Sequence, residues 1–166
     1  MSYKNKTYVI FDGDTDMWAY RYMRGWRANE NIDFNFFDAH DLKPLTDLAG
    51  EDTVKRRLKE RLSNTKQAIV IIGDSTKNLY RFVRWELQTC LDLDIPIIAV
   101  NLDGSRRQNN DFCPAIIRDE YVVYIPFKLK IIQHALDNFP SEYHRRNLSD
   151  KGPRFYNESI YKQLGI

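Results

Sequence analysis

The chain has 166 residues, of which 43% are hydrophobic and 29% are charged, and its formal net charge at pH 7 is +2. These values are typical of one globular domain with its own core, and they exclude an intrinsically disordered chain. The charge is too balanced to indicate a nucleic-acid partner, and the two cysteines provide neither metal-ligand spacing nor a disulfide framework. No apolar run reaches the length of a membrane span and residues 1–7 have no apolar signal region, so we expect a cytoplasmic protein without membrane contact.

The N-terminal part of the chain predicts a strand, a helix and a second strand. A β-branched and aromatic run at 7–11 stops at a turn, which is typical of a buried strand. The segment from about 15 to 29 is predicted to be a helix, because three aromatic residues recur there every four positions: Trp18, Tyr22 and Trp26. Residues 32–37 alternate apolar and polar side chains, which predicts a half-buried strand followed by a loop.

The central part predicts two helices around a buried strand. Residues 51–63 have one apolar seam and otherwise basic faces, which are either solvated or bind an anion or a partner. Residues 68–72 form a continuous apolar run, which predicts a strand covered on both faces. Apolar residues at helical spacing then predict a helix over 79–91.

The C-terminal part predicts two more strands and one helix. The strands are expected at 95–100 and 121–125, with a long polar loop at 101–119 between them. A helix is expected at 128–138. The segment after Pro140 has no clear period, and we expect it to pack on the domain through its aromatic residues Phe155, Tyr156 and Tyr161.

The alternation of strands and helices predicts an α/β fold. Continuous apolar strands favour a parallel sheet between two helical layers, and five strands with right-handed crossovers favour a flavodoxin-like order, 2-1-3-4-5. We therefore predict a single domain over 1–166, with a core at about 7–138 and a C-terminal extension at 139–166. Ligands of this fold bind at the carboxyl ends of the strands, near the switch point between strands 1 and 3.

Polar residues follow each of the first three predicted strands. Asp12 and Asp14 follow strand 1, Asp38 follows strand 2, and Asp74 and Ser75 follow strand 3. Because parallel strands end at one edge of the sheet, these residues are expected to form an acidic rim around a ligand cleft. The alternative is that each of them caps a helix or forms a turn, which is common for Asp and Ser.

Glu86 falls in the apolar stripe of the helix predicted at 79–91. Its neighbours on that stripe are Phe82, Val83 and Cys90. A carboxylate among apolar side chains is costly unless it is paired or used, and such surroundings raise carboxyl pKa values in enzymes. Glu86 is therefore either paired at the helix edge, for example with Arg81 or Arg84, or a functional acid.

Several common catalytic and binding patterns are absent from the sequence. It has no glycine-rich phosphate loop and no nucleophile elbow. The three histidines, His40, His134 and His144, have no metal-ligand spacing, so no metal site is predicted.

Two adjacent segments resemble a known family. Ile71-Ile72-Gly73-Asp74-Ser75-Thr76, followed by Phe82-Val83-Arg84-Trp85-Glu86-Leu87, resembles the third strand and the next helix of TIR domains. The usual pattern is a serine-bearing loop and then Trp-Cys-x-x-Glu-Leu, so Phe82 stands at the Trp position and Glu86 at the glutamate. The segments 11–14, 16–20, 38–41 and 97–102 resemble the bacterial TIR-like branch that includes the sensors of Thoeris anti-phage systems.

The resemblance covers about residues 7–138 and implies an activity. Such domains cleave the bond between nicotinamide and ribose in NAD, which is a substrate rather than a cofactor, with Glu86 at the position of the catalytic residue. Some members make an ADP-ribose-derived signal for a nucleotide-sensing effector. The resemblance also implies a phage-derived trigger and self-association on activation. The residues expected to border NAD are Phe11, Asp12, Asp14, Asp38, Asp74, Ser75 and Phe82.

Two other interpretations remain open on the sequence. A receiver-like phospho-switch has the same fold and would use Asp12, Asp14, Asp74 and Lys128 with Mg²⁺, but it offers no role for Glu86. A TIR scaffold without catalysis is the second alternative, because a fold does not prove a function. Substitution of Glu86 distinguishes the catalytic interpretation from the scaffold interpretation, because only a catalytic domain would lose activity while its assembly persists.

Overall fold

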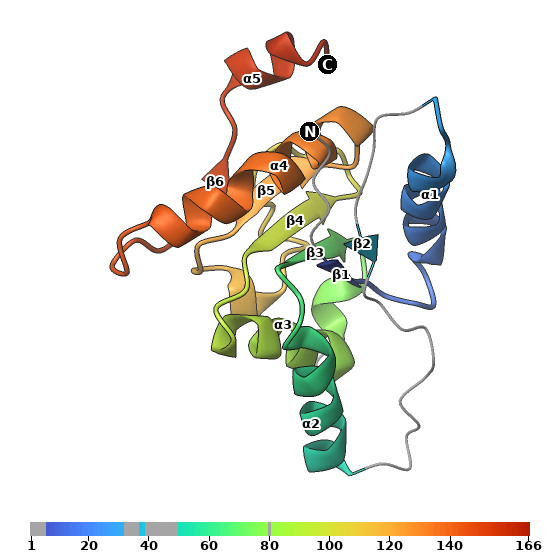
Figure 1. Ribbon diagram of the computed structural model, residues 1–166, viewed down its shortest axis with the longest axis vertical. Helices are drawn as coiled ribbons and strands as arrows, with labels where there is room; N and C mark the ends of the chain where they lie inside the picture. Colours follow the sequence, from blue (N-terminus) through green and yellow to red (C-terminus); the bar gives the residue numbers. More distant parts are fainter. Residues whose placement is uncertain (1–5, 32–36, 39–49, 80) are drawn as a thin grey trace.

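The computed structural model describes residues 6–31, 37–38, 50–79 and 81–166 (Figure 1). It contains one parallel sheet of six strands in the order β2-β1-β3-β4-β5-β6. The strands are β1 (Lys6–Ile10), β2 (Phe37–Asp38), β3 (Gln67–Ile72), β4 (Ile97–Asn101), β5 (Val123–Pro126) and β6 (Arg154–Phe155). The predicted order of the first five strands is confirmed, and β6 extends the sheet beyond the prediction.

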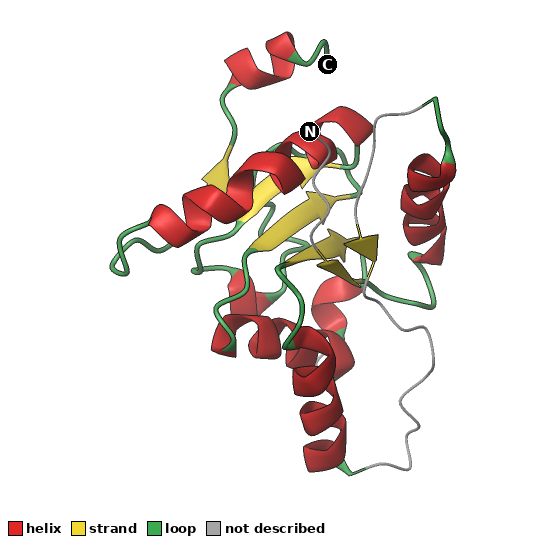
Figure 2. Ribbon diagram, viewed as in Figure 1, coloured by secondary structure: helices red, strands yellow, loops and turns green. Residues whose placement is uncertain are grey.

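Helices cover both faces of the sheet and make a three-layer sandwich (Figure 2). One layer contains α1 (Met17–Ala28) and α4 (Leu129–Arg145), and the other contains α2 (Glu51–Leu62) and α3 (Phe82–Asp92). The shorter helical segments are the 3-10 turns η1 (Thr76–Asn78) and η2 (Ala115–Ile117) and the C-terminal helix α5 (Glu158–Gln163).

Strand β1 shows how the sheet separates two hydrophobic cores. Val9 and Phe11 belong to the core under α1 and α4, whereas Tyr8 and Ile10 belong to the core under α2 and α3. Successive side chains of a strand point to opposite faces of the sheet, so β1 is buried on both faces. The continuous apolar runs of β3 and β4 are buried on both faces for the same reason, as predicted.

One predicted helix begins later than its sequence pattern indicates, and one predicted strand lies partly outside the described residues. The helix expected at 79–91 starts at Phe82, because the 3-10 turn η1 comes first and ends at Asn78, with Leu79 as its C-cap. Leu79 still packs at the edge of the core under α3. Of the strand expected at 32–37, residues 32–36 lie outside the described part of the chain, and β2 occupies Phe37–Asp38.

The C-terminal segment is more regular than predicted. Helix α4 continues through Pro140 to Arg145, so the expected end of the helix at 138 is wrong. Proline normally weakens a helix by removing one backbone hydrogen bond, but Phe139, Pro140 and Tyr143 are all buried here and hold the last turns on the domain. The Tyr161 side chain lies in the core under α1 and α4, which confirms that the tail packs on the domain.

The long loop after β4 is held by the tail. The Arg106 guanidinium lies 2.7 Å from a Glu158 carboxylate oxygen and 4.0 Å from the centre of the Tyr161 ring. Arg107 lies 4.0 Å from the centre of the Phe155 ring. These contacts join the loop and the tail into one unit at the carboxyl end of β4. Within the described ranges, no helix combines the length and the apolar character that a membrane crossing requires.

Candidate functional site

Glu86 lies in the middle of α3 and is half-buried. The Tyr8 hydroxyl, from β1, donates a hydrogen bond of 2.9 Å to Glu86 Oε1. Tyr8 itself is 1% exposed, and it lies in the same core as Val83 and Cys90, the apolar neighbours of Glu86 on α3. The apolar stripe of the predicted helix is therefore confirmed, with one carboxyl group inside it.

Burial dominates the ionisation of Glu86. It raises the pKa of Glu86 to about 7, although the Tyr8 hydroxyl and the positive charge of Arg61 on α2 act in the opposite direction. A carboxyl group with this pKa is present in both protonation states near neutral pH, as acid–base and charge-stabilising groups in enzymes often are. The hydrogen-bond partner is Tyr8 rather than Arg81 or Arg84, which the sequence suggested.

Phe82 is the first residue of α3 and lies at the start of its apolar stripe. It is half-buried, and its ring meets the Trp85 ring edge-on with 5.7 Å between centres. The Arg81 guanidinium lies 5.5 Å from the centre of the Phe82 ring. Phe82 thus packs within an aromatic and cationic cluster at the start of the helix that carries Glu86.

A second polar cluster joins the loops after β1 and β3. The Ser75 hydroxyl lies 2.6 Å from Asp12 Oδ2 and 3.1 Å from the Thr15 hydroxyl. The backbone N–H of Asp14 donates to Asp12 Oδ1 over 3.0 Å. The structure therefore brings Asp12 and Ser75 into direct contact, as the predicted rim requires. We call Asp12, Thr15, Asp16, Ser75 and Thr76 the polar rim.

The two buried carboxyl groups of the polar rim shift in opposite directions. Burial acts to raise the pKa of Asp12, but hydrogen bonds from Ser75, Asp14 and Thr15 outweigh it and lower the pKa below the usual value. Burial and the nearby negative charge of Asp12 raise the pKa of Asp16. Asp12 therefore holds its proton less tightly than Asp16 does.

Gly73 lets the two loops approach closely. A Cβ atom at Gly73 would overlap the Asp16 carboxylate, so a larger residue does not fit without movement. The backbone N–H of Gly73 donates to the Thr76 hydroxyl over 2.9 Å, and that hydroxyl lies 3.4 Å from Asp16 Oδ2. The Gly73-Asp74-Ser75-Thr76 segment is thereby fixed against the loop after β1.

The other predicted rim residues lie in different surroundings. Asp14 and Asp74 are exposed beside the rim, and the charge of Asp74 contributes to the raised pKa of Asp16. Asp38 is the last residue of β2, with its backbone opposite Thr7, and its side chain lies outside the described part of the structure. His40 lies outside the described residues as well.

Phe11 is separated from Glu86 by the sheet. It is 8% exposed and stacks on Tyr20 of α1, with 4.8 Å between ring centres and 15° between ring planes. Since Tyr8 and Phe11 point to opposite faces of β1, Glu86 and Phe11 do not line the same wall. The contact with Tyr20 shows that Phe11 packs in the core under α1 and α4.

Sequence reasoning did not identify Tyr8 or Asp16 as site residues, and it placed Thr76 after strand 3 without giving it a role. A buried tyrosine hydroxyl needs a hydrogen-bond partner, and the alternation along β1 points Tyr8 toward the predicted position of Glu86. That signal was present in the sequence. The roles of Asp16 and Thr76 depend on the close approach of two loops, which the sequence does not specify.

No group of three or more His, Cys, Asp or Glu side chains within the described ranges is arranged to hold a metal ion. The receiver-like interpretation also leaves Glu86 without a role, whereas the structure gives that residue a specific partner. No observation therefore favours a phospho-switch.

The sequence of the chain matches the model of a known protein family. The family model described as Thoeris protein ThsB, TIR-like domain, matches residues 2–107. The match covers more than half of the chain, and it includes Tyr8, Glu86 and both loops of the polar rim.

Proposed function

The chain belongs to the family of Thoeris ThsB TIR-like domains, and we propose that it cleaves the bond between nicotinamide and ribose in NAD. Membership of this family supports a TIR-domain role in anti-phage defence. The proposed reaction, its substrate and its product go beyond what membership establishes. They rest on the resemblance of the Glu86 helix to NAD-cleaving TIR domains and on the surroundings of Glu86.

The observation that carries the proposal is the carboxyl group of Glu86. It is half-buried at the edge of an apolar core, accepts a hydrogen bond of 2.9 Å from Tyr8 and has its pKa raised by burial to about 7. A purely structural position would be better served by an apolar residue, because a buried carboxyl group costs free energy. A glutamate there is explained if its charge is used.

The reaction needs a negative charge beside the ribose. When the bond from ribose C1′ to nitrogen breaks, its electron pair leaves with nicotinamide and the ribose becomes oxocarbenium-like, as in glycoside cleavage. The ionised Glu86 carboxylate stabilises that charge, and a fixed carboxylate in apolar surroundings does so more strongly than one in water. Water, or a hydroxyl or amino group of a second molecule, then bonds to C1′ and loses a proton.

The polar rim is the proposed contact for the rest of the dinucleotide. The Asp12 carboxylate accepts hydrogen bonds from Ser75, from the N–H of Asp14 and from Thr15, and we infer that it also accepts one from a ribose hydroxyl, as acids do in other dinucleotide sites. Asp14 and Asp74 are exposed beside it. The proposed contacts of NAD also include Phe11, Asp38, Ser75 and Phe82, with Phe82 at the start of the Glu86 helix.

The proposal includes regulation and partners. Unrestricted cleavage of NAD would harm the host cell, so we infer that a phage-derived trigger starts the reaction and that chains associate on activation. The product is an ADP-ribose-derived signal that a nucleotide-sensing effector of the same system detects. We infer that the loop after β4, which is joined to the tail by the ion pair of Arg106 with Glu158, responds to such association.

The test is incubation of the purified chain with NAD, with and without extract of phage-infected cells, and mass spectrometry of the products. We expect free nicotinamide and an ADP-ribose derivative from the wild type, and neither from Glu86→Gln. Glu60→Gln, at an exposed position of α2, is the control and should behave as the wild type. Equal product from Glu86→Gln would refute the catalytic role. If no product forms from any variant while the chains still associate, the non-catalytic scaffold is correct.

A further inference from the structure

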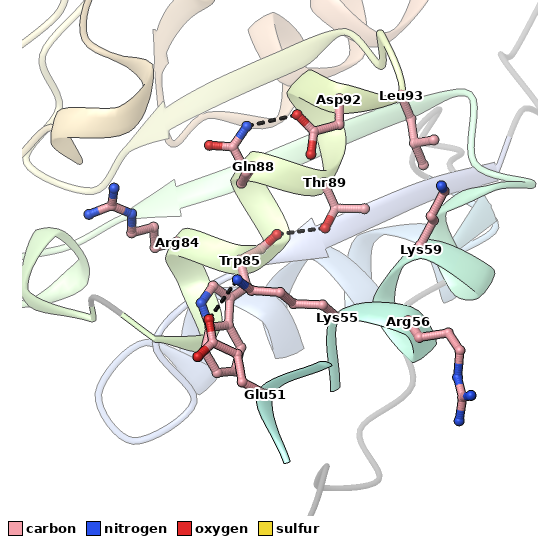
Figure 3. A pocket seen from close by; sticks show the side chains of 10 residues that line it. All are labelled: Glu51, Lys55, Arg56, Lys59, Arg84, Trp85, Gln88, Thr89, Asp92 and Leu93. Carbon is pink, nitrogen blue, oxygen red and sulfur yellow. Dashed lines mark hydrogen bonds and ion pairs between the residues drawn. The ribbon is translucent and has the colours of Figure 1, made fainter. Parts of the chain in front are cut away.

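A groove between α2 and α3 lies outside the proposed NAD site (Figure 3). Its volume is about 700 Å³. Small-molecule sites in proteins span about 300–1,000 Å³. Glu86 and the polar rim are absent from its lining, which consists of Glu51, Lys55, Arg56, Lys59, Arg84, Trp85, Gln88, Thr89, Asp92 and Leu93.

The charge of this groove is unbalanced. Four of its lining residues are cationic and two are acidic. Both acids are engaged inside the groove: Glu51 lies 2.6 Å from the Lys55 amino group, and Asp92 accepts a hydrogen bond of 2.8 Å from Gln88. No residue in the described part of the chain forms an ion pair or hydrogen bond with the side chains of Arg56, Lys59 or Arg84. Lys55 is thus neutralised by Glu51, while the other three cations of the groove have no acidic partner among the described residues.

The cations lie along both walls of the groove. Lys55 and Lys59 belong to α2 and are separated by about one helical turn, which is roughly 6 Å. Arg84 belongs to α3 and lies toward the opposite end of the groove from Lys59, with Trp85 and Gln88 between them (Figure 3). A ligand with several negative charges can contact both walls, whereas a single small anion contacts one end.

The floor between the cations supplies further polar groups. The Gln88 amide keeps one N–H and the carbonyl oxygen for a ligand after its bond to Asp92. The Lys55 amino group lies 5.3 Å from the centre of the Trp85 ring, close enough for a cation–π contact at the edge of the groove. Arginine and lysine side chains in this arrangement are the usual ligands of phosphate groups.

We propose that the groove between α2 and α3 is a second ligand site, which binds an anion with two or more phosphate groups. Free polyphosphate and the phosphates of a nucleotide share this chemistry. None of the lining residues is itself a proposed NAD contact, although Trp85 packs against Phe82 at the start of the Glu86 helix. The position of the groove on the outer side of α3 allows ligand binding and the reaction to be measured separately.

The experiment is isothermal titration calorimetry of the full chain with sodium tripolyphosphate and with ATP, at constant ionic strength because salt screens exposed charges. The ¹H–¹⁵N signal of the Trp85 indole reports whether the ligand enters the groove, with Trp18 and Trp26 as internal references. We expect the Trp85 signal to shift on titration. Equal affinity for both ligands assigns the site to phosphate groups alone, and tighter binding of ATP assigns it to nucleotides.

Two double variants with the same change in net charge decide whether binding depends on the cations of the groove or only on the net charge of the protein. Lys59→Ala/Arg84→Ala removes one cation from each wall and is expected to weaken binding at least tenfold. Arg57→Ala/Lys66→Ala removes two exposed cations that do not line the groove, and binding should change less than twofold. Equal losses in the two variants, no binding by the wild type or an unchanged Trp85 signal would refute the proposal. Glu86→Gln should bind as the wild type, and circular dichroism checks that each variant is folded.

Discussion

The core under α3 and the polar rim shift the pKa of a carboxyl group in opposite directions. Glu86 has one hydroxyl donor, from Tyr8, and burial raises its pKa to about 7. Asp12 has donors from Ser75, Asp14 and Thr15, and these lower its pKa in spite of burial. The balance between burial and the number of donors therefore decides whether each carboxyl group remains ionised. One molecule thus holds a permanent anion at its rim and a carboxyl group that titrates near neutrality in its core.

Replacing Glu86 by glutamine should have the largest effect. The neutral amide keeps the shape and loses the charge, so we expect NAD cleavage to fall by about 10²–10³-fold, as when other charge-stabilising groups are removed. Stability should change in the other direction. A raised pKa in the folded state means that Glu86 contributes most stability at low pH and loses it as pH rises through about 7. Relative to wild type, the variant should gain stability between pH 5 and pH 8, measured by urea unfolding.

Replacing Gly73 by alanine tests the closeness of the two rim loops. The new Cβ meets the Asp16 carboxylate, and such overpacking destabilises proteins by about 1–3 kcal/mol. Gly25→Ala is the matched control, since nothing lies within 4 Å of a Cβ at that position of α1. It should stabilise the helix by about 0.5–1 kcal/mol. The double variant Gly73→Ala/Asp16→Ala should recover part of the loss, and thermal unfolding that shows no recovery would contradict the predicted overlap.

Replacing Tyr8 by phenylalanine removes the donor of Glu86. Because that hydrogen bond favours the ionised form, its loss should raise the pKa of Glu86 further. We expect the pH at which NAD cleavage reaches half of its maximum to move upward, with several-fold lower turnover at pH 7. Tyr124→Phe, which removes another buried hydroxyl of the same core, should leave that pH midpoint unchanged. A shared shift would indicate a general loss of packing instead.

Replacing Ser75 by alanine should have the smallest effect, about 1 kcal/mol, which is typical of one hydrogen bond. The lowered pKa of Asp12 contributes stability above the usual Asp range and loses it as pH falls. The difference from wild type should therefore be present at pH 7 and vanish in acid. Ser105→Ala removes a similar bond of 2.9 Å, to Asp103, outside the rim. The two variants should differ in NAD affinity, which only Ser75→Ala is expected to weaken.

The sequence predicts the fold well where periodicity is strong. Continuous apolar runs identify β3 and β4, and the three-residue and four-residue spacing of apolar side chains identifies α3. The end of α4 was wrong because Pro140 is a local signal against a helix, whereas the buried Phe139 and Tyr143 act through tertiary packing. The strand β6 has two residues and no pattern of its own, so its pairing with β5 depends on the folded domain.

The candidate site is only partly visible in the sequence. The stripe on α3 is enough to identify Glu86 as unusual, and the ends of β1 and β3 are enough to place Asp12 beside Ser75. The separation of Phe11 from Glu86 follows from strand alternation and could have been predicted. The contact of Gly73 with Asp16 could not, because it depends on the exact path of two loops.

The short strand β6 also limits how copies of this chain can join. It forms one edge of the sheet with only two residues, Arg154 and Phe155, and the exposed Pro153 precedes it. A proline has no N–H to donate, and short edge strands with proline resist pairing with a strand of another molecule. Continuous sheets across chains, of the kind that lead to aggregation, are thus disfavoured at this edge. At the β6 edge, any association that accompanies activation should therefore be a reversible contact between side-chain surfaces, without strand pairing between chains.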